Sequence, residues 1–369
     1  MAYEIDFIGV GSESKKDADA ICLRWLDGDS YKIAVYDGGF QAHGEEMVRH
    51  LNEYYFDDTE GNKKREDKIV DCVIISHPDQ DHVSGIKNII ENFSVKRLYM
   101  NRPWLYLDEL YEKINDGRIT KKSLETRLKN VFSNIAEIES LAQDYDVDIL
   151  EIFEGKLICN KFLTLSPSRD FYLKLLVESN KTPLEESSNL LNFALKSFRA
   201  VANYVKNLLE TWSNEQLKED VSTSAENETS VVILGQDDEY FLLTGDAGIR
   251  ALRNAIDYAS KQNYSLKDIV KFYQVPHHGG RHNISPSILN DLIGEILPEN
   301  EKNDKIAFVS VAKDSDHPLQ MVVNAFIRRG ATIYKTNGAT IRHKINMPTR
   351  YGWSSVTALA FDENVEDWD

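Results

Sequence analysis

A six-residue string of histidines and aspartates lies in the first third of the chain. It reads His77-Pro-Asp-Gln-Asp-His82 and directly follows the apolar run 72–76, so it offers two imidazoles and two carboxylates at a strand end. Mixed nitrogen and oxygen donors suit Zn, Mn or Fe. A loop at the end of a strand can gather such side chains while the sheet holds the backbone rigid. We interpret the string as part of a metal site, because four potential ligands together are poorly explained as a polar turn.

Two later segments repeat this design. The apolar segment 240–244 is followed, after one glycine, by Asp246, and the segment 271–275 is followed, after one proline, by His277 and His278. Taken alone, Asp246 would be interpreted as a turn residue or a helix N-cap. Three apolar segments that each end in metal-ligand residue types predict one shared metal centre.

Strand-like and helix-like patterns alternate around these motifs and predict a mixed α/β fold. We expect strands at 3–10, 20–25, 31–36, 72–76, 96–100, 148–153, 161–165, 231–234, 240–244, 271–275, 306–311 and 331–334, and helices at 47–55, 86–93 and 319–329. The run 72–76 is apolar throughout, as expected for a strand that is covered on both faces.

Two stretches of helical apolar spacing interrupt this alternation, one at 124–138 and one at 191–212. We expect both to be helices that pack against the core or against each other. A lid over the site and a homodimer surface are the alternatives. No internal repeat or linker is evident, which favours a single domain over residues 1–369 with helical insertions at about 105–141 and 184–221.

Composition and charge limit the class of protein. Hydrophobic residues make up 42% and charged residues 28% of the chain, as in soluble globular proteins. No apolar run approaches the length of a membrane span, and we expect no membrane association. The start of the chain lacks a secretory pattern, and three dispersed cysteines indicate reduced core residues, so we expect a cytoplasmic protein. The net charge of −17 argues against strong nonspecific binding of DNA.

The three motifs together resemble the metallo-β-lactamase superfamily. More closely, they resemble the soluble hydrolase domain of the DNA-uptake protein ComEC and its stand-alone relatives. The match rests on His77, Asp79, Asp81 and His82, on the string 242–246 and on the string 276–279, with weaker similarity at 7–11, 36–39, 316–318 and 334–336. The resemblance implies a four-layer αββα sandwich and a metal-dependent hydrolase.

The resemblance also implies how two divalent ions, Mn or Zn, would be held. His77 and Asp79 would bind one ion, Asp81 and His82 the other, and Asp246 would bridge them, which makes Asp81 a catalytic residue as well as a ligand. The last histidine ligand is either His277 or His278. The superfamily pattern favours His278, and His277 would then support the ligands or face the substrate.

This chain departs from the family pattern at two places in the site. Asp79 stands where many members have a second histidine, and no histidine lies between His82 and His277. In the ComEC-like branch, a stretch like 227–230 occupies the place of the missing histidine, so Asn227 or Ser230 would assist there as substrate-binding residues. The site is therefore rich in oxygen donors, which moves the expected metal from Zn toward Mn.

The opening pattern of the branch is altered as well. It becomes Gly11-Ser-Glu-Ser14, followed by a longer loop that contains Lys15 and Lys16.

Four further residues are weaker candidates. His317 would protonate a leaving group or bind a phosphate, and a surface histidine at a helix start is the equal alternative. Arg281 and His282 would contact an anionic substrate, unless they belong to a solvated loop. Asp37 precedes two glycines, so it is a turn residue or a support for the metal ligands.

The function expected first is a metal-dependent phosphodiesterase or nuclease that acts on DNA or another nucleic acid through an activated water. A small-molecule metallohydrolase for a cyclic nucleotide, lactone or thioester is the second hypothesis. A non-catalytic metal-binding protein is the third.

Overall fold

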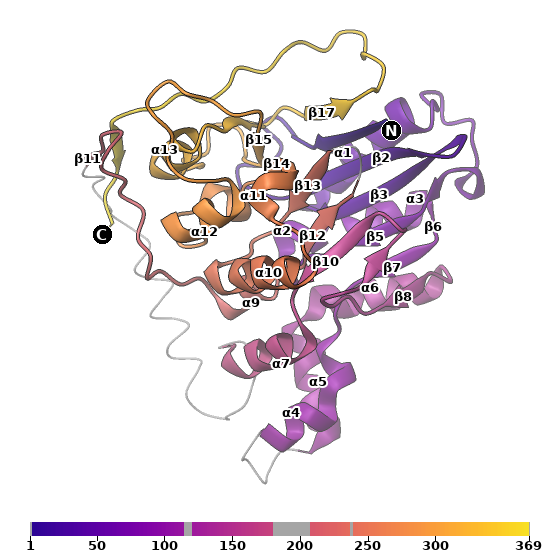
Figure 1. The fold of residues 1–369 in the computed structure, drawn as a ribbon. Helices are drawn as coiled ribbons and strands as arrows, with labels where there is room; N and C mark the ends of the chain where they lie inside the picture. The colour runs from indigo at the N-terminus through magenta and orange to yellow at the C-terminus, as the bar shows by residue number, and fades with distance from the viewer. Residues whose placement is uncertain (1, 114–119, 180–206, 237–238, 369) are drawn as a thin grey trace.

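The structure, a computed structural model, describes residues 2–113, 120–179, 207–236 and 239–368. Two seven-stranded sheets form its centre (Figure 1). The first has the order β17 (Ile341–Ile345), β1 (Tyr3–Phe7), β2 (Ala20–Asp27), β3 (Ser30–Gly38), β5 (Cys72–Ile74), β7 (Arg97–Tyr99) and β8 (Asp148–Leu150). The second has the order β16 (Thr332–Lys335), β15 (Ile306–Val309), β14 (Val270–Gln274), β13 (Tyr240–Leu243), β12 (Val232–Gly235), β10 (Phe162–Ser166) and β9 (Leu157–Ile158).

The inner faces of the two sheets pack against each other through large apolar side chains. On β1, Tyr3 and Phe7 point into this layer, where Tyr3 packs on Phe241 and Phe7 makes edge contacts with Phe272 and Phe308. Edge-to-face contacts of this kind add to the free energy gained by burying apolar area. This aromatic layer holds the two sheets at a fixed separation.

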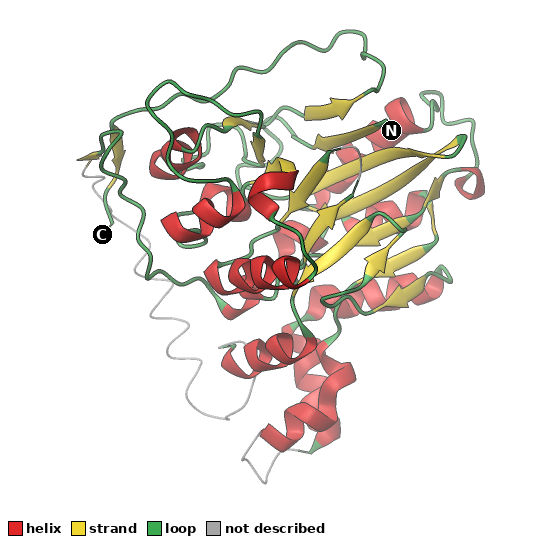
Figure 2. Ribbon diagram, in the orientation of Figure 1, coloured by secondary structure: helices red, strands yellow, loops and turns green. Residues whose placement is uncertain are grey.

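Helices cover both outer faces (Figure 2). The first sheet is covered by α1 (Gln41–His50), α3 (Ile86–Asn92) and α6 (Ser133–Asp144), and the second by α10 (Ile249–Lys261), α11 (Leu266–Ile269), α12 (Pro286–Leu292) and α13 (Gln320–Arg328). Their apolar faces form two further cores, with Met47 and Ile89 in the first and Leu252 and Val322 in the second. The predicted four-layer αββα sandwich is confirmed.

Most predicted strands are present, including the edge strands β8 and β16, but the edge strands β9 and β17 were not anticipated. Strand β17 pairs antiparallel with β1 and completes the first sheet. Its polar sequence, Ile341-Arg-His-Lys-Ile345, lacks the apolar run that marks the central strands, because it lies at the edge of the sheet.

The first predicted insertion is helical, whereas the described part of the second is not. Residues 105–141 contain α4 (Leu107–Lys113), α5 (Lys121–Val131) and most of α6, and α4 and α5 lie with α7 (Arg169–Glu178) at the lower edge of Figure 1. The second insertion falls partly outside the described residues. From residue 207 the expected helix is replaced by strand β11 (Asn207–Leu209), which pairs with the C-terminal strand β18 (Asn364–Glu366). The helical prediction is wrong there, because Leu208 packs on the outer core of the second sheet from this strand.

Strand direction determines where the loops meet. Strands β3 and β5 are parallel neighbours, as are β13 and β14, so each pair delivers its carboxyl-terminal loops to one edge of its sheet. The Tyr36 hydroxyl donates to the Val231 carbonyl (2.6 Å), and the Val231 N–H donates to the Ser76 carbonyl (3.0 Å), which ties these edges together. No helix among the described residues is long and apolar enough to cross a membrane.

Candidate metal centre

The three predicted motifs converge at the edge where the two sheets are joined. The string His77–His82 follows β5 and leads into the short helix α2 (Gln80–Val83). Asp246 follows β13. His277 and His278 lie after β14, in the short 3-10 turn Pro276–Gly279. A backbone hydrogen bond from the His277 N–H to the Gly245 carbonyl (3.1 Å) holds the last two loops side by side.

One group of donor atoms forms around His77. Its Nε2 atom lies 3.9 Å from Asp79 Oδ2 and 3.8 Å from Asp246 Oδ2. His277 approaches the same oxygen of Asp246, with an Nε2–Oδ2 distance of 3.6 Å. His77, Asp79 and His277 therefore surround one oxygen of Asp246.

A second group forms around His82, on the other oxygen of Asp246. His82 Nε2 lies 3.3 Å from Asp246 Oδ1 and 4.0 Å from Asp81 Oδ2. His278 Nε2 lies 3.7 Å from Asp81 Oδ2. Asp246 thus presents one oxygen to each group, an arrangement suited to bridging two ions.

The structure brings both histidines of the pair to the site, although the sequence pattern favoured one. His278 joins the group of Asp81 and His82, as the pattern suggested. His277 joins the group of His77. His277 therefore adds a second imidazole to the donor group around His77.

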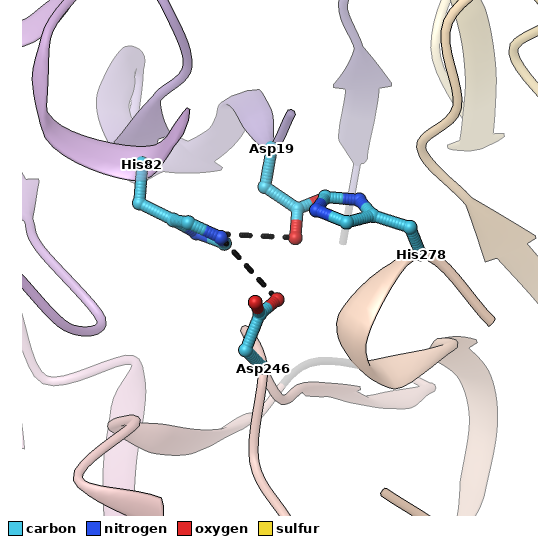
Figure 3. Close-up of side chains that lie close together, drawn as sticks. All are labelled: Asp19, His82, Asp246 and His278. Atoms are coloured by element: carbon cyan, nitrogen blue, oxygen red, sulfur yellow. Dashed lines mark ion pairs between the residues drawn. The ribbon is translucent and has the colours of Figure 1, made fainter. Parts of the chain in front are cut away.

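Asp19, which the sequence analysis missed, belongs to the same cluster. Its carboxylate, with His82, Asp246 and His278, offers ligand atoms that all lie within 4.8 Å of one another. The close-up shows these four side chains pointing toward a common centre (Figure 3). Asp19 is 1% exposed, and its Oδ2 atom has no hydrogen-bond partner. The signal available in the sequence was an acidic residue directly before the apolar strand 20–25, hidden by the longer loop at Lys15 and Lys16.

Each of the four histidines is held by its Nδ1 atom. His82 Nδ1 donates to Asp37 Oδ2 (2.8 Å), His278 Nδ1 to the Ser310 carbonyl (2.9 Å) and His277 Nδ1 to Asn283 Oδ1 (2.7 Å), while His77 Nδ1 lies 3.1 Å from Ser76 Oγ. Such contacts fix the orientation of each ring and leave Nε2 as the metal-binding atom.

Asp37 and Ser76 form the base of this support. Asp37 is fully buried and accepts hydrogen bonds from the Ser76 N–H (2.7 Å) and hydroxyl (2.6 Å) as well as from His82. Its three acceptor contacts match the carboxylate–histidine pairing seen around many metal ligands. The structure therefore places Asp37 behind the ligands.

The backbone of the histidine pair is in an unusual conformation. His277 and His278 have φ values of 49° and 55°, and Gly245, which contacts this turn, has a φ of 52°. Residues with a Cβ rarely adopt this left-handed region, at a cost of about 1–2 kcal/mol each. In this turn, the His277 imidazole lies beside Asp246 Oδ2 and the His278 imidazole lies beside Asp81, so each histidine joins a different donor group.

The donor atoms fit metal ions better than they fit one another. The buried atoms His77 Nε2, His82 Nε2, His278 Nε2 and Asp246 Oδ1 converge without a hydrogen-bond partner. A buried polar atom without a partner costs about 1–3 kcal/mol, so a cluster of them indicates a missing ligand. Imidazole and carboxylate donors in this number would hold two divalent ions.

The protonation of the cluster agrees with this interpretation. Burial opposes the charge on His278, but the Asp81 contact and the Asp19 and Asp246 carboxylates raise its pKa to about 9. Burial likewise opposes the charge on His82, yet the carboxylates of Asp246 and Asp37 raise its pKa well above the usual value. In the absence of metal, protons on these two imidazoles balance the acidic groups.

His77, Asp81 and Asp246 take the protonation states expected beside two charged imidazoles. Burial lowers the pKa of His77, which keeps that imidazole neutral. Burial favours the neutral acids of Asp81 and Asp246, but neighbouring histidines outweigh it and hold both pKa values below the usual range.

Asn227 and Ser230, expected near the substrate, are buried. The Asn227 side chain bonds to Thr223 and Ser224 within its own loop. The Ser230 hydroxyl accepts a hydrogen bond from the Asp246 N–H (3.2 Å). Both residues therefore shape the loop around Asp246, and we interpret them as positioning residues, in place of the predicted substrate contacts.

Arg281 and His282 lie near the end of the chain. The Arg281 guanidinium donates to the Asp367 carbonyl and stacks on Trp368, and His282 meets the edge of the same ring. Arg281 thus anchors the C-terminal segment. His282 also lines a cavity of about 650 Å³ that contains His277, so it remains placed to meet a substrate.

His317 lies at the rim of the centre, about one third exposed. Its Nδ1 atom donates to Asp17 Oδ2 (2.8 Å), and its neighbour Pro318 packs against Gly279, directly after the histidine pair. The Leu319 N–H donates to the Gly279 carbonyl (3.2 Å), which fixes this contact.

Comparison with known proteins finds a family model that matches part of this chain. The family model described as the metallo-beta-lactamase superfamily matches residues 26–154, a segment that includes His77, Asp79, Asp81 and His82. This match covers about a third of the chain, and over those residues the chain is similar to the metallo-beta-lactamase superfamily. No curated protein matches it.

Solved structures with some similarity include the metallo-beta-lactamase fold protein YhfI from Bacillus subtilis, at 9% identity and a TM-score of 0.42 over 93% of this chain and 100% of that one. The dizinc quorum-quenching lactonase AidC gives 10% identity and a TM-score of 0.28 over 68% and 69%. The subclass B3 metallo-beta-lactamase MEM-A1, from a soil metagenome library, gives 10% identity and a TM-score of 0.31 over 78% and 85%.

Metal uptake will release protons. Because ligand imidazoles must be neutral, ions that enter at pH 7 displace the protons of His82 and His278. Below the raised pKa values, the apparent affinity should weaken by about tenfold per pH unit for each proton displaced. Chelator competition at pH 6, 7 and 8, with proton release followed by an indicator dye, measures both effects. The His278→Asn variant should release one proton fewer, and equal release by the two proteins would contradict this assignment.

Asp19→Asn should weaken metal binding without unfolding the chain. The substitution removes the charge but keeps the size of the side chain and the bond from the Asp19 N–H to the Asp81 carbonyl (3.1 Å). We expect about 10- to 100-fold lower affinity for one ion. Metal stoichiometry after dialysis at set free metal concentrations measures this loss, and Asp27→Asn, at the exposed end of the same strand, is the control. Unchanged stoichiometry and affinity would remove Asp19 from the metal centre.

Proposed function

We propose that this protein is a two-metal phosphodiesterase that acts on DNA or another nucleic acid. The observation that carries the proposal is the position of Asp246, whose two carboxylate oxygens face separate donor groups 3.3–3.8 Å away. Two ions held side by side in this way suit an in-line displacement at phosphorus, where attacking and leaving oxygens both need stabilisation. When bound, the ions would lower the pKa of water and stabilise charge on phosphoryl oxygens.

The donor set supports this choice over an all-nitrogen zinc site. Asp19, Asp79, Asp81 and Asp246 supply oxygen donors beside the four histidines. Oxygen donors suit hard ions such as Mn, and phosphate oxygens are hard ligands for the same ions. We therefore propose Mn or Zn as the natural metal, with Mn as the first choice.

His317 is the proposed proton donor for the leaving group. Asp17 holds its Nδ1 atom, which leaves Nε2 directed away from that contact on a partly exposed ring. Asp17 also accepts from the Ala312 N–H (2.7 Å) and the Ser315 hydroxyl (2.9 Å), so it is a fixed anchor. A histidine oriented by a carboxylate is a common general acid.

Three further expectations are retained as proposals. The cytoplasmic location is supported by three cysteines that form no disulfide. A single domain is supported by the shared inner core of the two sheets. A homodimer through the insertions is the least supported, and light scattering after size-exclusion chromatography tests it.

A hydrolysis panel tests the proposed activity. With Mn or Zn, the protein should cleave bis-p-nitrophenyl phosphate and linear DNA, while Asp246→Asn should lose at least about 100-fold in kcat, because both donor groups lose their shared charge. RNA, a cyclic dinucleotide and a lactone complete the panel. Exposed Asp257→Asn, on α10, is the matched control. Turnover of the lactone without any phosphodiester would overturn the proposal in favour of a small-molecule metallohydrolase.

His317→Asn should affect substrates according to their leaving group. A p-nitrophenolate leaves without protonation, so kcat on bis-p-nitrophenyl phosphate should fall less than about threefold. The nucleoside alkoxide of DNA needs a proton, and kcat there should fall by about 10²–10⁴. Asp17→Asn should reproduce part of the second effect. Equal losses on both substrates would assign His317 a purely structural role.

A further inference from the structure

A cavity of about 610 Å³ opens directly beside the metal-binding string. Its wall is formed by residues 13–16 of the long opening loop, the start of α1, residues 80–87 and the start of α6. Gln80, which lines it, stands between the candidate ligands Asp79 and Asp81. The volume falls in the range of about 300–1,000 Å³ that is typical of ligand pockets.

Three lysines line this cavity, namely Lys15, Lys16 and Lys87. In the part of the chain that the structure describes, none of their ammonium groups forms an ion pair; Lys16 lies 6.0 Å from the ring of Phe40. Other lysines, such as Lys96 and Lys271, pair with aspartates. Because these three ammonium groups line one cavity and no carboxylate of the described residues pairs with them, the cavity wall carries positive charge that favours an anionic ligand.

A second cavity beside the metal centre has a different charge. The cavity of about 650 Å³ that contains His277 and His282 is lined by Glu178, Glu226 and Glu228, with Arg250 as its one arginine. The lysine cavity carries only Glu13 and Glu137 against its three lysines. An anionic group that neighbours the reacting phosphate would therefore be attracted to the lysine side.

We propose that the lysine cavity binds a second phosphate of a nucleic-acid strand, next to the phosphodiester held at the metals. This inference rests on the proposed phosphodiesterase function and narrows its substrate to chains with at least two phosphates. Lysine ammonium groups recognise phosphate as mobile point charges without base selectivity. Gln41, Gln80 and Asn134 add polar groups to the same wall. The subsite gives affinity and direction to the strand, and it carries no information on sequence.

The test compares two substrates in one triple variant, Lys15→Ala, Lys16→Ala and Lys87→Ala. On a single-stranded oligodeoxynucleotide, KM should rise at least tenfold with kcat within about twofold. The slope of log KM against log salt should become shallower by about 0.7, which is the contribution of one phosphate contact on a single strand. On bis-p-nitrophenyl phosphate, which has one phosphate, KM should not change.

A matched control variant separates the effect of the cavity lysines from the effect of the net charge of the protein. Lys156→Ala, Lys261→Ala and Lys267→Ala remove three exposed lysines that do not line the cavity, and they change the net charge equally. This variant should keep the oligonucleotide KM of the parent protein. Equal rises in both variants, or a rise on bis-p-nitrophenyl phosphate as large as that on the oligonucleotide, would overturn the subsite.

Binding provides a readout that does not depend on turnover. Fluorescence anisotropy of a labelled oligonucleotide, with Asp246→Asn as the background, should show at least tenfold weaker binding when the three cavity lysines are removed. If the parent protein hydrolyses no phosphodiester, the proposed function fails while this measurement still decides whether the cavity binds phosphate. Unchanged binding in a protein that does hydrolyse phosphodiesters overturns the subsite alone.

Discussion

The structure depends on the cost of collecting buried carboxylates at one point. Asp19, Asp37 and Asp246 are each at most 3% exposed, and Asp81 lies against them. Charges removed from water in this way repel one another and favour protonation, so they persist only with cations nearby. In the absence of metal, His82 and His278 supply that positive charge, and divalent ions would supply more of it. The acidic cluster is thus built for a cation.

Two sets of contacts hold the side chains of the metal centre in position. The aromatic layer between the sheets sets the separation of β5 from β13 and β14, and the contacts of Tyr36 and Ser76 with Val231 join their loops. The Nδ1 contacts of the histidines then fix each ring within that frame. Because rigid strands carry the loops and hydrogen bonds orient the rings, little rearrangement is needed for the site to bind metal, which is the condition for electrostatic catalysis to be efficient.

Local sequence patterns were sufficient to predict part of the fold and part of the metal centre. Apolar runs followed by ligand residue types predicted the central strands and the convergence of His77, His82 and Asp246, while the family resemblance implied the αββα layers. The role of His277 and the presence of Asp19 were not predictable in this way, because they depend on a left-handed turn and on a loop of unusual length. Strands β11 and β17 were missed for a related reason: their pairing partners lie far away in the sequence, so tertiary contacts outweigh local propensity.

The net charge of −17 and a nucleic-acid substrate are compatible once distance is considered. At physiological salt, charges more than about 8 Å from a phosphate are largely screened, so the acidic surface acts mainly on the rate of encounter. In the proposed complex, bound phosphates would feel mainly the groups within a few ångströms, namely the metal ions and the lysines of the neighbouring cavity. The acidic surface would disfavour nonspecific binding along a duplex. Only a strand that reaches the metal centre and the lysine cavity would then be bound. If the proposed subsite binds phosphate, that distribution of charge would favour a reachable strand, such as an end or a single-stranded segment.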